Sequence, residues 1–105
     1  FYPGSWLIAI DAVKIIDPEF CFYGPAEYDL GVFIAHLKMA GCDPLLIGLV
    51  AENYHLPINT VLLNAFTGTE ILRRLIGLAQ LPLQLSVDDK KNLLEEAVLL
   101  LDEYQ

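Results

Sequence analysis

Basic residues are scarce in this sequence. Only 6 Lys and Arg stand against 14 Asp and Glu among 105 residues, so the formal net charge is -8. Such a surface repels phosphate backbones and acidic lipid head groups, which argues against binding to nucleic acid or to membranes. Cysteine is also rare: Cys21 and Cys42 belong to no C-x-x-C motif and no Cys/His cluster. We therefore expect two buried, reduced thiols, with neither a disulfide framework nor a structural zinc site.

Long hydrophobic runs are absent as well. Asp11 ends the apolar run at 6–10 and Glu52 ends the run at 45–51, and both runs are far shorter than the roughly 20 residues that span a membrane. The first residues also lack the basic and apolar segments of a signal peptide. These absences lead us to expect a cytoplasmic protein without a membrane anchor.

What is present is a chain that is 55% apolar, and we expect one domain over residues 1–105. The fold class expected is mostly α (α+β), with an N-terminal β-hairpin followed by four to five helices. The predicted segments are strands at 6–10 and 13–16 around a turn at 11–12, a loop at 17–25, and helices at 26–40, 44–54, 57–80 (kinked or divided at 67–69) and 86–101. The hairpin is apolar on both faces, so we expect both faces to be covered.

The segment that carries chemistry starts where the second predicted strand ends. Asp17 stands at that end, and Glu19 follows it. A carboxylate fixed by a sheet, with a second acid nearby, suits Mg²⁺, which proteins hold through one or two carboxylates together with phosphate and water oxygens. The same spacing also fits a capping Asp and a solvated Glu. Spacing alone therefore leaves both interpretations open.

The wider pattern favours the metal site. Residues 17–20 are Asp-Pro-Glu-Phe, residues 23–25 are Tyr-Gly-Pro, and residues 29–31 are Asp-Leu-Gly. This run resembles the metal-binding segment of aminoglycoside phosphotransferases and methylthioribose kinases, relatives of the protein-kinase fold, and is most similar to the methylthioribose kinase branch. The resemblance implies that the chain is part of the C-terminal lobe of an enzyme that uses ATP and Mg²⁺ to phosphorylate a hydroxyl of a small sugar-like molecule.

The resemblance also implies roles for the matching residues. Asp17 would hold Mg²⁺ against the nucleotide phosphates, with Glu19 as a second ligand or its partner. Ser5 falls where many relatives place a metal-binding asparagine, so it is a candidate ligand. Asp29 would be a structural acid at the start of its helix. The alternative for Asp29 is an ordinary first-turn acid favoured by the helix dipole.

A second stretch, Glu-Ile-Leu-Arg-Arg ending at Arg74, resembles a helix of methylthioribose kinases whose arginine pair lies near the substrate side of the cleft. Because adjacent helical residues point about 100° apart, at most one of Arg73 and Arg74 is expected to face such a site. The alternative is that the arginines pair with Glu70 at i,i+3 or i,i+4. His36 and His55 are expected to be structural, because no Ser, Cys or acid partner lies at an informative spacing.

The chief departure from the family pattern is an absence. The sequence contains no His-Gly-Asp triplet, no Gly-rich loop and no strand lysine paired with a helix glutamate. These parts supply the catalytic base and the nucleotide cradle in phosphoryl transfer. We therefore expect the chain to be inactive alone, with no catalytic residue of its own, as a fragment whose N-terminal lobe is missing.

An alternative function is a non-catalytic, self-associating interaction module derived from a kinase-like fold. Loss of a lobe leaves apolar surface and a hairpin edge bare, and such surfaces favour association. On this basis we expect a homodimer, formed through the hairpin or through the helix at 26–40.

Overall fold

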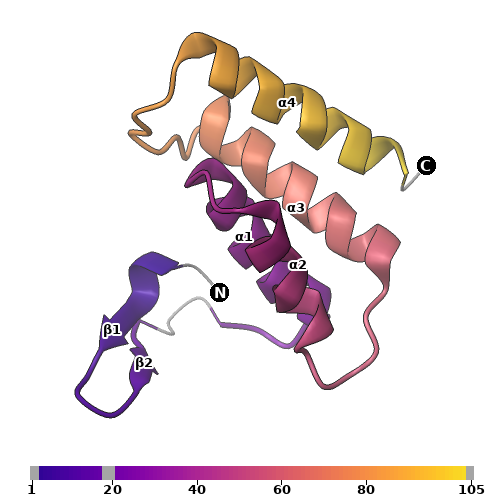
Figure 1. Cartoon of the computed structure of the whole chain (residues 1–105). Helices are drawn as coiled ribbons and strands as arrows, with labels where there is room; N and C mark the ends of the chain where they lie inside the picture. Colours follow the sequence, from indigo (N-terminus) through magenta and orange to yellow (C-terminus); the bar gives the residue numbers. More distant parts are fainter. Residues whose placement is uncertain (1–2, 18–20, 104–105) are drawn as a thin grey trace.

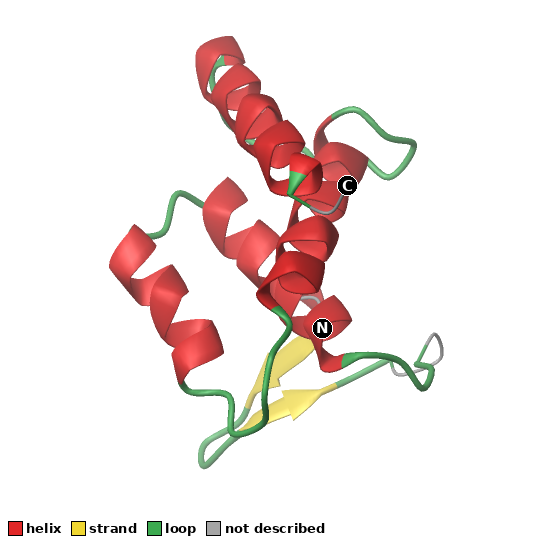
Figure 2. Cartoon of the chain, turned by 90° about the vertical axis from the view of Figure 1, so that its right-hand side faces the viewer, coloured by secondary structure: helices red, strands yellow, loops and turns green. Residues whose placement is uncertain are grey.

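A computed structural model describes residues 3–17 and 21–103 and places a small β-hairpin beside a bundle of helices (Figure 1). The elements in chain order are a 3-10 turn Pro3–Ser5, the strands β1 (Trp6–Ile8) and β2 (Val13–Ile15), and the helices α1 (Ala26–Met39), α2 (Pro44–Glu52), α3 (Thr60–Leu75) and α4 (Val87–Asp102). The predicted fold class is confirmed. Figure 2 shows the hairpin at one end of the molecule, below the helices. In the part of the chain that the structure describes, no helix is long and apolar enough to cross a bilayer.

The hairpin is shorter than predicted. β1 and β2 pair antiparallel with three residues each. The Ala9 N–H donates to the Ala12 carbonyl over 2.8 Å, and this bond leaves Ile10 and Asp11 as the two turn residues. The turn therefore lies one residue earlier than the predicted Asp11–Ala12.

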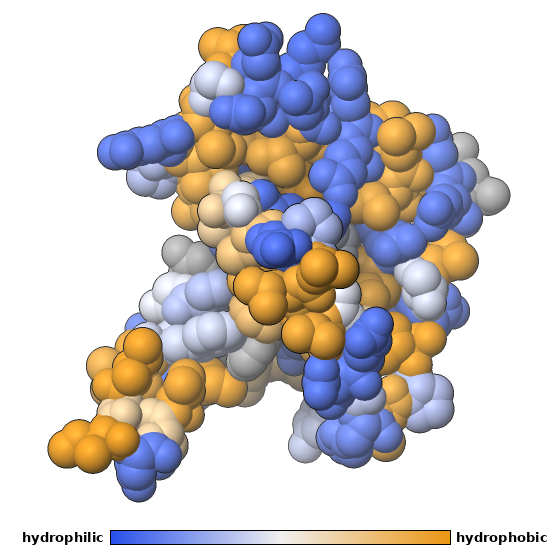
Figure 3. Space-filling model, viewed as in Figure 1, coloured by the Kyte–Doolittle hydropathy of each residue, from blue (hydrophilic) through white to orange (hydrophobic). Residues whose placement is uncertain are grey.

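Most of the hairpin is uncovered, although its apolar sequence predicted cover on both faces. The Trp6 ring packs on the Phe33 ring of α1, with centroids 5.0 Å apart, and so joins the hairpin to the helices. The exposed apolar side chains are those of Leu7, Ile8, Ile10, Val13, Ile15 and Ile16. Figure 3 shows hydrophobic residues gathered on this projecting hairpin at the lower left.

Three helix starts follow local signals in the sequence. The Asp43 carboxylate accepts from the Leu45 N–H over 2.9 Å and caps α2. Ser86 and Asp89 form a reciprocal capping box at the start of α4, as predicted. Asn59 caps α3 by accepting from the Leu62 N–H, so α3 begins at Thr60 and not at Pro57.

The far end of α3 also differs from the prediction. The helix ends at Leu75, because Gly77 turns the chain so tightly that an added Cβ would lie 2.6 Å from the Arg73 carbonyl oxygen. The predicted division at 67–69 is wrong, since α3 is one continuous helix there. Thr67 and Thr69 instead donate their hydroxyl hydrogens to carbonyls four residues earlier in the same helix. The helix therefore continues through Thr67, Gly68 and Thr69, the residues that were expected to interrupt it.

Glycines let the three long helices approach closely. A Cβ on Gly31 of α1 would lie 2.7 Å from Cβ of Phe66 in α3, and one on Gly68 of α3 would lie 2.7 Å from the Ala97 carbonyl of α4. The buried centre between these helices consists of Ala35, Met39, Ile71 and Ala97, surrounded by partly buried leucines. The core is thus a stack in the order α1, α3, α4, with the hairpin outside it.

Candidate functional site

The hairpin brings Ser5 and Asp17 to the same end of the sheet. The Ile16 N–H donates to the Ser5 carbonyl over 2.8 Å, which continues the β1–β2 pairing outward by one step and leaves Asp17 as the next residue. Asp17 is exposed and has a φ of 54°, a left-handed conformation that Asp tolerates better than most residues. Strained conformations of this kind cluster at functional sites. Ser5 and Asp17 therefore lie near the same end of the hairpin, just beyond the ends of opposite strands.

Glu19, the second predicted ligand, lies outside the described residues. Asp29 is exposed in the first turn of α1. It lies one helical turn before Phe33, the residue that receives Trp6, so it shares the helix side that meets the hairpin. Among residues 3–17 and 21–103, no group of three or more His, Cys, Asp or Glu side chains is arranged to hold a metal.

The loop after the hairpin is held to the helices by aromatic rings. Phe22 lies edge-on to Tyr28 of α1 at 5.1 Å between centroids, and Tyr28 lies edge-on to Phe66 of α3 at 5.4 Å. On the same helix, Glu27 accepts from the Asn59 N–H over 2.8 Å, a bond that lowers the pKa of Glu27. The Tyr-Gly-Pro part of the motif is therefore followed directly by a helix start that is fixed to α3.

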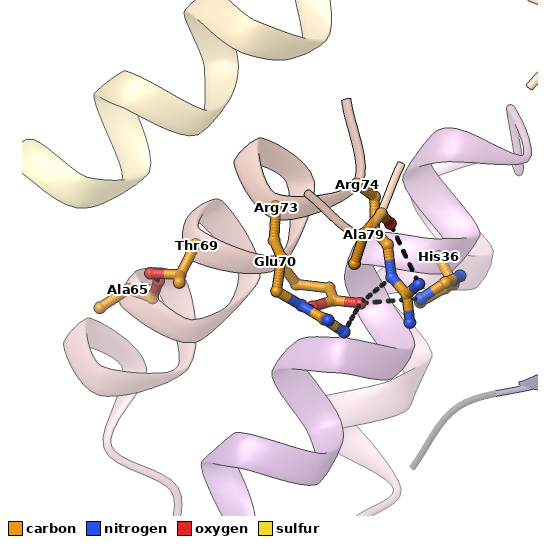
Figure 4. A network of polar contacts seen from close by, with 7 residues as sticks. All are labelled: His36, Ala65, Thr69, Glu70, Arg73, Arg74 and Ala79. Atoms are coloured by element: carbon orange, nitrogen blue, oxygen red, sulfur yellow. Dashed lines mark hydrogen bonds and ion pairs between the residues drawn. The ribbon is translucent and has the colours of Figure 1, made fainter. Parts of the chain in front are cut away.

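The arginine pair lies in a partly buried network that also joins α1 and α3 (Figure 4). Glu70 of α3 is only 4% exposed. Arg73 donates to it through Nε over 2.7 Å and through Nη2 over 3.2 Å, and Arg74 donates through Nε over 2.8 Å. His36 of α1 lies with Nε2 3.1 Å from Oε1 of Glu70. We call these four residues the Glu70 cluster.

Charge in the Glu70 cluster holds its carboxylate ionised. Burial alone would raise the pKa of Glu70, but hydrogen bonds from His36, Arg73 and Arg74 and the charge of Arg73 outweigh it and lower the pKa to about 2. In return, the bond to Glu70 raises the pKa of the Arg73 guanidinium. A buried carboxylate that pairs with two arginines of α3 and also contacts His36 of α1 is a cross-link between α1 and α3.

This geometry fits the ion-pair interpretation of both arginines. Arg74 also donates to the Ala79 carbonyl over 3.3 Å, which ties the chain after α3 to the helix. Arg73 keeps 47% of its side chain exposed, against 15% for Arg74. If either arginine faces a ligand, Arg73 is the more accessible of the two. The sequence predicted the pairing with Glu70 but missed His36, which lies 34 residues away along the chain.

Comparisons with known proteins place these residues in context. A methylthioribose kinase of Geobacillus thermodenitrificans is 56% identical over 38 residues, which are 36% of this chain and 10% of that kinase. The Bacillus cereus enzyme is 33% identical over 114 aligned positions, covering 74% of this chain and 28% of the kinase. That of a Geobacillus species is 27% identical over 130 positions, covering 90% of this chain and 32% of the kinase.

The chain spans less than a third of the length of these curated relatives. No protein-family profile matches it, and no solved structure does. The resemblance predicted from the motif residues is nevertheless confirmed: this chain is similar in sequence to methylthioribose kinases over as much as 90% of its own length.

Proposed function

We propose that this chain is a C-terminal-lobe segment of an ATP- and Mg²⁺-dependent kinase that phosphorylates a hydroxyl of a small sugar-like substrate. The observation that supports the proposal is that Ser5 and Asp17 lie near the same, open end of the hairpin, in a chain similar to methylthioribose kinases. A carboxylate and a hydroxyl are both oxygen donors of the hard type that Mg²⁺ prefers.

The residues present fit the part of the reaction that holds the metal. Asp17 would supply the charged oxygen, and Ser5 a neutral one, while phosphate and water oxygens complete the coordination in sites of this kind. The bound ion would neutralise the charge of the phosphates during transfer. Asp29 would act as a structural acid at the start of α1. Arg73, the more exposed arginine of the Glu70 cluster, would face an anionic group of a ligand.

Phosphoryl transfer itself needs groups that these 105 residues do not contain. The sequence has no His-Gly-Asp triplet to orient the accepting hydroxyl. We therefore expect the chain to bind a divalent ion weakly and not to turn over ATP by itself. Metal-dependent ATP hydrolysis or transfer by the pure chain would contradict this part of the proposal.

The metal site is tested with Mn²⁺, a paramagnetic substitute for Mg²⁺. Titration of the isotope-labelled chain should broaden the amide NMR signals of Ser5, Ile16 and Asp17 before others. Asp17→Asn should remove this broadening, and it preserves the fold because Asn also tolerates a positive φ. Asp11→Asn, in the turn at the opposite end of the same hairpin, is the matched control and should leave the broadening unchanged. Equal broadening in both variants would refute the site.

The cellular location in this proposal is the cytoplasm. Both cysteines are free thiols, but the expected burial is wrong, because Cys21 is exposed and Cys42 is partly exposed. Free, accessible thiols persist in a reducing compartment, which is also where an ATP-dependent kinase finds its nucleotide.

A second function, a non-catalytic interaction module, is supported by the exposed hairpin. Its apolar side chains include Ile8 at 84% and Ile10 at 109% exposure, and contiguous apolar surface of this kind marks contact with another protein surface. α1 is a weaker candidate for such contact, because Val32, Ile34, Ala35 and Met39 are already buried within the bundle.

A further inference from the structure

Helix α2 carries an exposed apolar side. The helix packs against α1, but its Leu45, Leu46 and Leu49 side chains are 80%, 60% and 46% exposed. Gly48 is exposed too, and positions 45, 48 and 49 share one side of the helix because they are three or four residues apart. In Figure 3, hydrophobic residues gather over α2 at the centre of the view. We call Leu45, Leu46, Gly48 and Leu49 the α2 face.

Gly48 differs from the other glycines inside the described α-helices. A glycine costs a helix roughly 0.5–1 kcal/mol relative to alanine. In α1 and α3 it allows a neighbouring helix to approach: a Cβ on Gly31 would lie 2.7 Å from Cβ of Phe66, and one on Gly68 would lie 2.7 Å from the Ala97 carbonyl. A Cβ on Gly48 would meet nothing within 4 Å. Gly48 therefore leaves a notch among exposed leucines, where a further helix can approach α2 as closely as α4 approaches α3.

Both ends of the α2 face are acidic. Asp43 caps the first turn of α2, and Glu52 ends the helix on the side that carries Leu45 and Leu49. Both acids are exposed, and the sequence has no Lys or Arg from residue 39 to residue 72 to offset them. A second copy of the chain would set Asp43 against Asp43 or against Glu52, and either contact is repulsive. The face is complementary instead to an apolar helix with a cation at each end.

We propose that the α2 face binds a helix of a different protein, one that has an apolar side, a small residue at the middle of that side, and Lys or Arg near both ends. The small residue would lie opposite Gly48, as Ala97 lies opposite Gly68 within the bundle. The cations would lie beside Asp43 and Glu52, which are about 13 Å apart along the helix axis. The leucines supply the apolar contact, and the charges select the partner.

A synthetic helical peptide tests the proposal. The peptide has Leu along one side, Ala at the centre of that side and two Lys at its ends, spaced to match the two acids; a matched peptide has Glu in place of both Lys. Titration with the Lys peptide should shift the amide NMR signals of Leu45, Gly48 and Leu49 of the isotope-labelled chain before others. The Glu peptide should bind at least about tenfold more weakly, because two attractive pairs become repulsive.

Variants of the chain separate shape from charge. Gly48→Leu should raise the dissociation constant of the Lys peptide about tenfold, because the new side chain fills the notch, while the free chain stays at least as stable since Leu favours a helix. Asp43→Asn combined with Glu52→Gln should raise it about fivefold, and Asn preserves the helix cap. Asp11→Asn combined with Asp102→Asn neutralises two exposed acids elsewhere and should change it less than twofold.

Four outcomes overturn the proposal. The first is that the Lys peptide shifts no α2 signal at millimolar concentration, or shifts those of the hairpin or of α4 first. The second is equal weakening by the two charge-neutralised double variants, which would mean attraction to the net charge alone. The third is that Gly48→Leu leaves binding unchanged or tightens it. The fourth is a dimer of the unliganded chain in sedimentation velocity that Gly48→Leu dissociates, because the α2 face would then bind a second copy.

Discussion

A single side chain, Glu70, joins two helices and compensates three cationic or donor groups. Its carboxylate accepts from Arg73 and Arg74 of its own helix and meets His36 of α1. Removal of one partner from a buried charge network leaves the others without their counter-charge, which costs much more than loss of a surface pair. We therefore expect Glu70→Gln to lower the free energy of unfolding by about 3 kcal/mol, measured by urea denaturation.

Glu96→Gln is the control for this variant. Glu96 pairs with Lys38 of α1, but its side chain is 40% exposed, and such pairs contribute less than about 1 kcal/mol. If the two substitutions cost the same, Glu70 does not act as a buried cross-link.

The low pKa of Glu70 gives this cross-link a defined pH range. Since the pKa falls from 4.5 to about 2 on folding, the carboxylate stabilises the folded state fully above about pH 4.5. That contribution, at most about 3 kcal/mol, is lost as the pH drops toward 2. Other acids titrate in the same range, so the readout is the difference in unfolding free energy between the original chain and Glu70→Gln. This difference should shrink steadily from pH 5 to pH 2, and a constant difference would contradict the assignment.

Sequence reasoning predicted three of the four residues of the Glu70 cluster and missed His36. The arginines and Glu70 lie three and four residues apart, and helical geometry alone predicts that they meet. His36 is on another helix, 34 residues away, and its contact follows from how α1 packs on α3. Likewise, the motif named Ser5 and Asp17, but only the hairpin register places both near one end of the sheet.

Among the helices, close packing at glycine decides where substitution is tolerated. A Cβ on Gly68 of α3 would lie 2.7 Å from the Ala97 carbonyl and 3.1 Å from Cγ of Leu101. Gly68→Ala should therefore push α4 away and destabilise the fold by about 1–3 kcal/mol, measured by thermal or urea unfolding. Gly48→Ala in α2 meets nothing within 4 Å and should stabilise by about 0.5–1 kcal/mol, the helix propensity gain. A destabilised Gly48→Ala together with a neutral Gly68→Ala would mean that the helices pack differently.

The ends of helices could be predicted where they depend on residues close together in the sequence. The caps at Asp43 and Ser86 depend on a side chain and a backbone N–H a few residues apart, so the sequence contains all that is needed. The ends of α3 were harder to predict, because the sequence offers more than one signal for each. Asn59 caps the helix although Pro57 was the predicted start, and the helix ends just before Gly77. The first strand was predicted too long because its apolar run continues past Ile8 to Ile10, which is a turn residue.

At the scale of the whole molecule, the buried core and the exposed apolar side chains of the hairpin lie in different parts of the structure. The stack of α1, α3 and α4 contains the buried residues, whereas the hairpin is held to it by the Trp6–Phe33 contact and leaves its other apolar side chains in solvent. The hairpin also carries Ser5 and Asp17, the residues to which the proposed function assigns the metal. Apolar area contributes to stability only where folding removes it from water.

This separation predicts that the hairpin tip is dispensable for stability. Ile8 and Ile10 are 84% and 109% exposed, so Ile8→Ser combined with Ile10→Ser should change the free energy of unfolding by no more than about 0.5 kcal/mol. The same double variant should lower the fluorescence of bound 8-anilinonaphthalene-1-sulfonate about twofold or more, because that dye binds exposed apolar surface. Leu63→Ser, which places a hydroxyl at a side chain only 5% exposed, is the opposite control and should destabilise by several kcal/mol. If the hairpin variant instead lost more than 1 kcal/mol, its tip would be covered in solution, and a contact of the hairpin with another surface would replace the exposed arrangement described above.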